Sequence, residues 1–105
     1  MRIALLQEER YLPSFHGSNK SNRCLLEGLA REGHECLALC SVMLRDMSRE
    51  DLHVDFARRG IELHESPDGL CSYCHRGVGV RGMPHLAGAP ERSAFLLANL
   101  REFDP

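Results

Sequence analysis

Apolar and polar residues alternate along the first part of the chain in a way that predicts a strand, a helix and a second strand. Residues 3–6 form a short apolar run typical of a buried strand, and residues 36–42 form a second such run bounded by charge. Between them we expect a helix that Gly17 or Ser18 caps and that runs to about residue 32, where Gly33 ends it as a left-handed cap. The apolar face of this helix consists of Leu25, Leu26, Leu29 and Ala30. This order predicts one βαβ unit.

The rest of the chain carries less regular signals. Ser48 and Asp51 resemble a capping pair for a helix over residues 49–59, which Gly60 would end. Alternation and amphipathic spacing predict a strand over residues 61–65, a strand over residues 78–80 and a helix over residues 91–102. The segment Pro67-Asp68-Gly69 is expected to turn the chain. Together these elements predict an α/β fold, Rossmann-like, with a short and mainly parallel sheet.

Length and charge narrow the classes of function. The chain has 105 residues, enough for one domain, and its 13 Lys+Arg against 15 Asp+Glu give a net charge of −2. This balance argues against charge-driven binding to nucleic acid or to an anionic membrane. No apolar run approaches the roughly 18 residues of a membrane span, and the first residues lack the features of a signal peptide. We therefore expect a cytoplasmic protein whose five cysteines are reduced thiols.

The loop after the first strand is the best candidate for a binding site. It covers eleven residues, from Gln7 to Gly17, whereas strand-to-helix loops usually have about 2–6 residues. A helix N-terminus offers free N–H groups to an anion, beyond the carboxyl end of the strand. The candidate residues for a substrate or phosphate are His16, Gly17, Ser18, Asn19 and Lys20. The structural alternative is a capped helix with a solvated lysine, and His16 as a plain loop residue rather than a general base.

A second motif, Cys71-Ser72-Tyr73-Cys74-His75, suggests three different interpretations. Cys-x-x-Cys-His is the attachment sequence of c-type haem, but covalent attachment requires export, which the N-terminus does not indicate. Cys71, Cys74 and His75 could bind zinc together with His64 or His85, although a second close pair of ligands is missing. The simplest interpretation is a cysteine-containing loop without a metal.

Several segments of the chain resemble a known enzyme family. Residues 1–42 contain an aromatic-Leu-Pro loop, Gly17-Ser18-Asn19-Lys20 at the start of the first helix, and the passage LAREGHEC over residues 29–36. Arg76-Gly77-Val78-Gly79-Val80 and the final Leu-Arg-Glu-Phe-Asp-Pro add weaker matches. These features resemble the N-terminal domain of the retaining GT-B glycosyltransferases of family 4. Many members of that family carry Gly-Gly where this chain has Gly17-Ser18.

The resemblance implies a fold and an activity. Residues 1–105 would be part of the acceptor-side, Rossmann-like N-terminal domain, and the C-terminal donor domain would lie outside this sequence. The whole enzyme would transfer a sugar from a nucleotide-sugar donor to a hydroxyl acceptor, with retention and without a cofactor or metal. These residues alone would be inactive.

Two alternatives from other functional classes stay open at this point. One is a stand-alone Rossmann-like module that binds a phosphorylated ligand without turnover. The other is a small zinc-binding protein that uses Cys71, Cys74 and His75. In addition, a partial sheet would expose a strand edge, through which we expect self-association.

Overall fold

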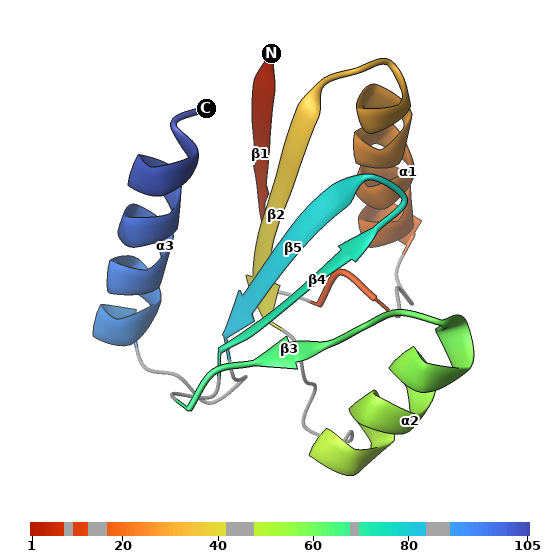
Figure 1. The fold of residues 1–105 in the computed structure, drawn as a ribbon. Helices are drawn as coiled ribbons and strands as arrows, with labels where there is room; N and C mark the ends of the chain where they lie inside the picture. The colour runs from red at the N-terminus through yellow and green to blue at the C-terminus, as the bar shows by residue number, and fades with distance from the viewer. Residues whose placement is uncertain (8–9, 13–16, 42–47, 68–69, 84–88) are drawn as a thin grey trace.

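The chain folds around one central sheet with helices on both of its faces (Figure 1). The structure is a computed structural model that describes residues 1–7, 10–12, 17–41, 48–67, 70–83 and 89–105. Its strands are β1 (Arg2–Leu6), β2 (Glu35–Ser41), β3 (His64–Glu65), β4 (Cys71–His75) and β5 (Val78–Met83). Its helices are α1 (Gly17–Arg31), α2 (Arg49–Arg59) and α3 (Ala89–Phe103). None of the helices in this described part is long and apolar enough to cross a membrane.

The five strands lie in the order β1-β2-β5-β4-β3. β1 pairs with β2, and β2 with β5, in parallel, whereas β4 pairs antiparallel with both β5 and β3. The α/β class that the sequence predicts is therefore confirmed. The prediction of a mainly parallel sheet is wrong, because two of the four strand pairs are antiparallel.

The antiparallel half arises from a hairpin that the sequence analysis missed. Residues 71–75 form β4 rather than a loop, with Cys71 and Tyr73 buried on one face and Cys74 exposed on the other. Arg76 and Gly77 make the two-residue turn into β5, and both have left-handed backbone angles, with φ of 50° and 83°. Such angles at both turn positions are typical of the tight turns whose twist matches a hairpin.

The two faces of the sheet carry separate cores. α1 and α2 cover one face, where Leu26, Leu52 and Phe56 pack with the side chains of Tyr73 and Val80. The rings of Phe56 and Tyr73 meet edge to face, with centroids 4.6 Å apart. α3 lies on the opposite face, where its apolar residues pack against β1 and β2 through Ala4, Leu37, Leu39, Phe95, Leu96, Leu100 and Phe103.

Local sequence signals fixed most element boundaries. α2 has the predicted bounds, with a reciprocal capping box between Ser48 and Asp51 and a left-handed cap at Gly60. Gly33 has a φ of 98°, as expected for the residue that follows α1. α3 begins two residues earlier than predicted and ends one residue later. The strand predicted over residues 61–65 is paired only at His64 and Glu65, and the predicted turn at 67–69 lies partly outside the described residues.

Candidate functional site

The first turn of α1 lies at the edge of the sheet where the parallel strands end. β1 and β2 run in the same direction, and α1 connects the end of one to the start of the other. Its start is therefore beside the carboxyl ends of both strands. Gly17, Ser18 and Lys20 are exposed there, and Asn19 is half-buried. A Cβ atom on Gly17 would meet no atom of the other described residues within 4 Å, its chain neighbours aside.

The same turn carries an unusual charge for a helix N-terminus. Helices prefer acidic residues in the first turn, because the aligned peptide dipoles leave a partial positive charge there. α2 has Glu50 and Asp51 in its first turn, and α3 has Glu91. α1 has no acidic residue in its first turn and has Lys20 instead. The positive potential of this helix end is therefore reinforced by its own side chains.

The middle of the loop that leads to this turn, residues 10–12, is packed into the protein. Arg10, Tyr11 and Leu12 are almost completely buried, with exposed fractions of 4%, 1% and 2%. The Gln7 side-chain amide donates to the Arg10 carbonyl over 3.2 Å. Burial, together with the nearby Glu27 carboxylate, raises the pKa of Tyr11 well above its ordinary value, so its phenol stays protonated. His16, the fifth predicted site residue, lies outside the described residues.

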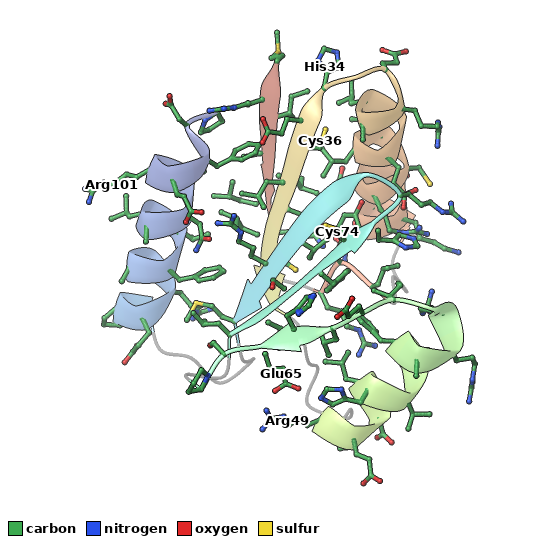
Figure 2. The ribbon with its side chains drawn as sticks, in the orientation of Figure 1. His34, Cys36, Arg49, Glu65, Cys74 and Arg101 are labelled. Atoms are coloured by element: carbon green, nitrogen blue, oxygen red, sulfur yellow. The ribbon has the colours of Figure 1, made fainter. Side chains whose placement is uncertain are left out.

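The structure does not bring together the proposed zinc ligands. Successive side chains of a strand point to opposite faces, so Cys71 and His75 of β4 lie on the face of α1 and α2. Cys74 lies on the other face and is exposed (Figure 2). Among the described residues, no three His, Cys, Asp or Glu side chains are close enough to hold a metal ion. His85 lies outside them.

A buried ionic cluster on α1 is a feature that the sequence analysis missed. Glu27 is only 2% exposed, and its carboxylate faces cations from two parts of the chain. Arg23 Nη1 is 3.2 Å from Glu27 Oε1, His75 Nε2 is 3.5 Å from the same oxygen, and Arg76 Nη1 is 3.7 Å from Oε2. The spacing of Arg23 and Glu27, four residues apart on a helix, was the available local signal.

A second ionic cluster joins α2 to the sheet edge. Glu65 of β3 pairs with Arg49 in the first turn of α2 and with His53 one turn later; Figure 2 labels Arg49 and Glu65. The hydrogen bond from Arg49 is the main reason why the pKa of Glu65 is below its ordinary value. The start of α2 is thus engaged in internal contacts.

A shallow depression of about 610 Å³ lies on the sheet face that carries α3. Its lining includes His64, Ser72, Cys74, Gly79 and Arg81. The Arg81 guanidinium is already held by α3, through Asn99 Oδ1 at 2.7 Å and Glu102 Oε1 at 3.4 Å. The Arg81 guanidinium that lines the depression is therefore already paired within the protein. The start of α1 is the better candidate for binding an anionic ligand.

Comparison with known proteins gave no match: no family model, no curated protein and no solved structure is significantly similar to this chain. What the fold defines is a mixed α/β protein with a partly parallel five-stranded sheet.

Proposed function

We propose that this chain is part of the acceptor-side domain of a glycosyltransferase, which passes a sugar from a nucleotide-sugar donor to a hydroxyl acceptor. The observation that carries the proposal is the first turn of α1, which is exposed, lacks acidic residues and carries Lys20 at the carboxyl ends of parallel strands. The sequence resemblance to the retaining GT-B enzymes includes the same residues, 17–20, and so supports the same binding site. A Rossmann-like arrangement of β1, α1, β2 and β5 is part of the proposal.

In this function, α1 acts by binding rather than by covalent chemistry. Free N–H groups at a helix N-terminus and a lysine ammonium group both stabilise negative charge, such as the charge that develops on a leaving diphosphate. Gly17 has no side chain, and no other described residue comes within 4 Å of where its Cβ would be, so a ligand can approach the backbone closely from that side. Orientation of donor and acceptor against each other would supply much of the rate. A retaining transfer of this kind does not require a general base.

The expected cytoplasmic location belongs to this proposal. All five cysteines are free thiols, as is usual in a reducing compartment. Three of them, Cys36, Cys40 and Cys71, are buried in the core beneath α1 and α2, and burial raises the pKa of Cys40 to about 12. These thiols are inert packing groups.

An NMR titration of the chain tests the binding step. Uridine diphosphate and inorganic pyrophosphate are added separately, and backbone amide shifts are followed. We expect the largest changes at residues 17–20, reduced severalfold by Lys20→Ala and unaffected by Arg58→Ala, which removes an exposed arginine from α2. Shifts confined to the depression around His64 and Cys74, or no shifts with either probe, would contradict the proposed site.

A stand-alone module for a phosphorylated ligand is the second candidate, because the same helix end would serve it. Both candidates predict binding at residues 17–20, but only the glycosyltransferase predicts sugar transfer by the product of the complete coding sequence.

We further propose that β1 mediates self-association. β1 is the last strand of the sheet on its side, and its Leu6 is 47% exposed. An unpaired strand edge without charge or proline toward its end is a template for pairing with another chain. Sedimentation at increasing concentration should show association that Leu6→Lys weakens and Leu97→Lys, a matched change on α3, does not. Equal weakening of association by Leu6→Lys and Leu97→Lys would contradict self-association through β1.

A further inference from the structure

The buried cluster around Glu27 joins two parts of the fold that no strand pairing connects directly. Glu27 and Arg23 belong to α1, whereas His75 and Arg76 lie at the turn between β4 and β5. The turn also sits close to the helix, because a Cβ atom on Gly77 would be 3.4 Å from the Ala30 side chain. The turn is thus held on α1 by one close backbone approach and one set of ion pairs.

The Arg76 side chain also contributes to how this turn is held. Arg76 has a φ of 50°, in the left-handed region that a side chain other than glycine rarely adopts. A residue keeps such an angle when the surrounding structure imposes it. Here the ion pair between the Arg76 guanidinium and Glu27 favours this backbone conformation, because it holds the Arg76 side chain against α1.

The balance of charge around His75 decides what protonation would do. The side chain of His75 is only 17% exposed, and it faces Glu27 and Arg23 of α1 and Arg76 of the turn, with Arg59 of α2 also near enough to act on it. Tyr11 acts on the same carboxylate but stays neutral. The Glu27 carboxylate therefore already forms ion pairs with two guanidinium groups, those of Arg23 and Arg76. A protonated His75 would add another cation in a space with little solvent to screen it.

We propose that Glu27, Arg23, His75 and Arg76 form an acid-sensitive latch, which holds the β4–β5 turn on α1 while His75 is neutral and releases it when His75 is protonated. This inference does not depend on the proposed glycosyltransferase function. It assigns a role to a buried histidine that the candidate site at the start of α1 does not use.

The direction of the titration agrees with this mechanism. Burial is the largest effect and lowers the pKa of His75; the Glu27 carboxylate raises it, and the nearby arginines lower it again, leaving it below the ordinary value. A histidine whose pKa is lower in the folded state contributes its full stability above the ordinary pKa of about 6.5 and loses it as the pH falls below that value. The latch should therefore open on mild acidification.

Amide hydrogen exchange tests the release. Protection factors at residues 75–78 are compared between about pH 7.5 and about pH 5.5, the range in which histidine titrates. We expect a severalfold loss of protection at the turn, with protection in β2 retained. His75→Gln, which cannot be protonated, should abolish this pH dependence, whereas His64→Gln, which replaces an exposed histidine on β3, should leave it intact. Turn protection that does not change with pH, or that changes equally in His75→Gln, would overturn the proposal.

A ring titration of His75 by NMR separates the latch from a general loss of stability. The midpoint should lie below the ordinary histidine value of about 6.5, and Glu27→Gln should lower it further, since the Glu27 carboxylate that faces His75 is removed. If Glu27→Gln fails to fold, Arg76→Gln is used instead and should raise the midpoint, because one of the repelling cations is lost. A wild-type midpoint at or above the ordinary value of about 6.5 would mean that acid tightens the cluster, and would refute the latch.

Discussion

α1 and α2 lie on the same face of the sheet but begin in opposite ways. α2 starts with a complete capping box, two acidic residues in its first turn and an Arg49 that reaches Glu65 of the sheet. α1 starts with Gly17-Ser18-Asn19-Lys20, exposed for the most part and without an acidic residue. The first turn of α2 carries acidic residues that complement its helix dipole, whereas the first turn of α1 carries none. This difference is the reason for proposing the start of α1, rather than that of α2, as the ligand site.

The largest expected effect concerns how α1 is held in place at its other end. Removing one partner from a buried ionic cluster leaves uncompensated charges, so Glu27→Ala should lower the free energy of unfolding by about 3–5 kcal/mol. Urea denaturation measures this loss. Glu32→Ala, an exposed change just after the same helix, should cost less than about 0.5 kcal/mol. Similar losses in the two variants would show that α1 is not anchored through Glu27.

A direct contrast of the two helix starts gives the next largest effect. Ser48 accepts a hydrogen bond from the Asp51 amide, so Ser48→Ala should lower the free energy of unfolding by about 1 kcal/mol. Ser18→Ala in the first turn of α1 should change it by only a few tenths of a kcal/mol or slightly stabilise the fold, roughly as helix propensity dictates. An equal cost at Ser18 would mean that the start of α1 is engaged in internal contacts like that of α2.

The Arg49–Glu65 pair should give a smaller, pH-dependent effect. Because the pKa of Glu65 is lowered in the folded state, the pair stabilises the protein above the ordinary carboxyl pKa and loses this contribution as the pH falls through the lower, folded-state value. Glu65→Gln should cost about 0.5–1 kcal/mol near neutral pH, since Arg49 is largely exposed. Thermal unfolding at neutral and at acidic pH should show the difference between the two proteins shrink with acid. A difference that grows with acid would contradict this.

The smallest effect on stability should accompany a large effect on binding. Lys20→Glu gives α1 the kind of first turn that α2 has, and an acidic residue there should stabilise the helix by about 0.3–1 kcal/mol. The same change should abolish the pyrophosphate-induced shifts at residues 17–20. Stability and binding would thus move in opposite directions, which a purely structural helix start does not explain. Loss of both would indicate damage to the fold.

Much of the parallel half of the fold could be predicted from the sequence, because its signals are local. Apolar runs, capping residues and Gly33 and Gly60 defined β1, α1, β2 and α2 to within a residue or two. β4 was missed because its alternation depends on Cys71, Tyr73 and Cys74, a pattern that suggested chemistry rather than a strand. Two residues of the predicted third strand gained partners only because β4 lies beside them.

The start of α1 and the cluster around Glu27 differ in the same way in how far the sequence could predict them. The start of α1 could be predicted, because a long loop before a helix is a property of neighbouring residues. The cluster at Glu27 could not, since its partners His75 and Arg76 come from the far end of the β4 strand and reach α1 only through the sheet. The haem- or zinc-like motif shows the converse: residue type alone suggested chemistry, but the alternation of β4 places Cys71 and Cys74 on opposite faces of the sheet.

The most direct test of the account is an assay of sugar transfer by the purified product of the complete coding sequence. It is supplied with a panel of radiolabelled nucleotide sugars and hydroxyl acceptors, alongside its Lys20→Ala and Arg58→Ala variants. The account predicts transfer that falls at least about tenfold in kcat/KM with Lys20→Ala, equivalent to about 1.4 kcal/mol of transition-state stabilisation, and is unchanged with Arg58→Ala. A product that binds pyrophosphate at residues 17–20 but transfers no sugar from any donor would contradict the glycosyltransferase and leave a binding module in its place.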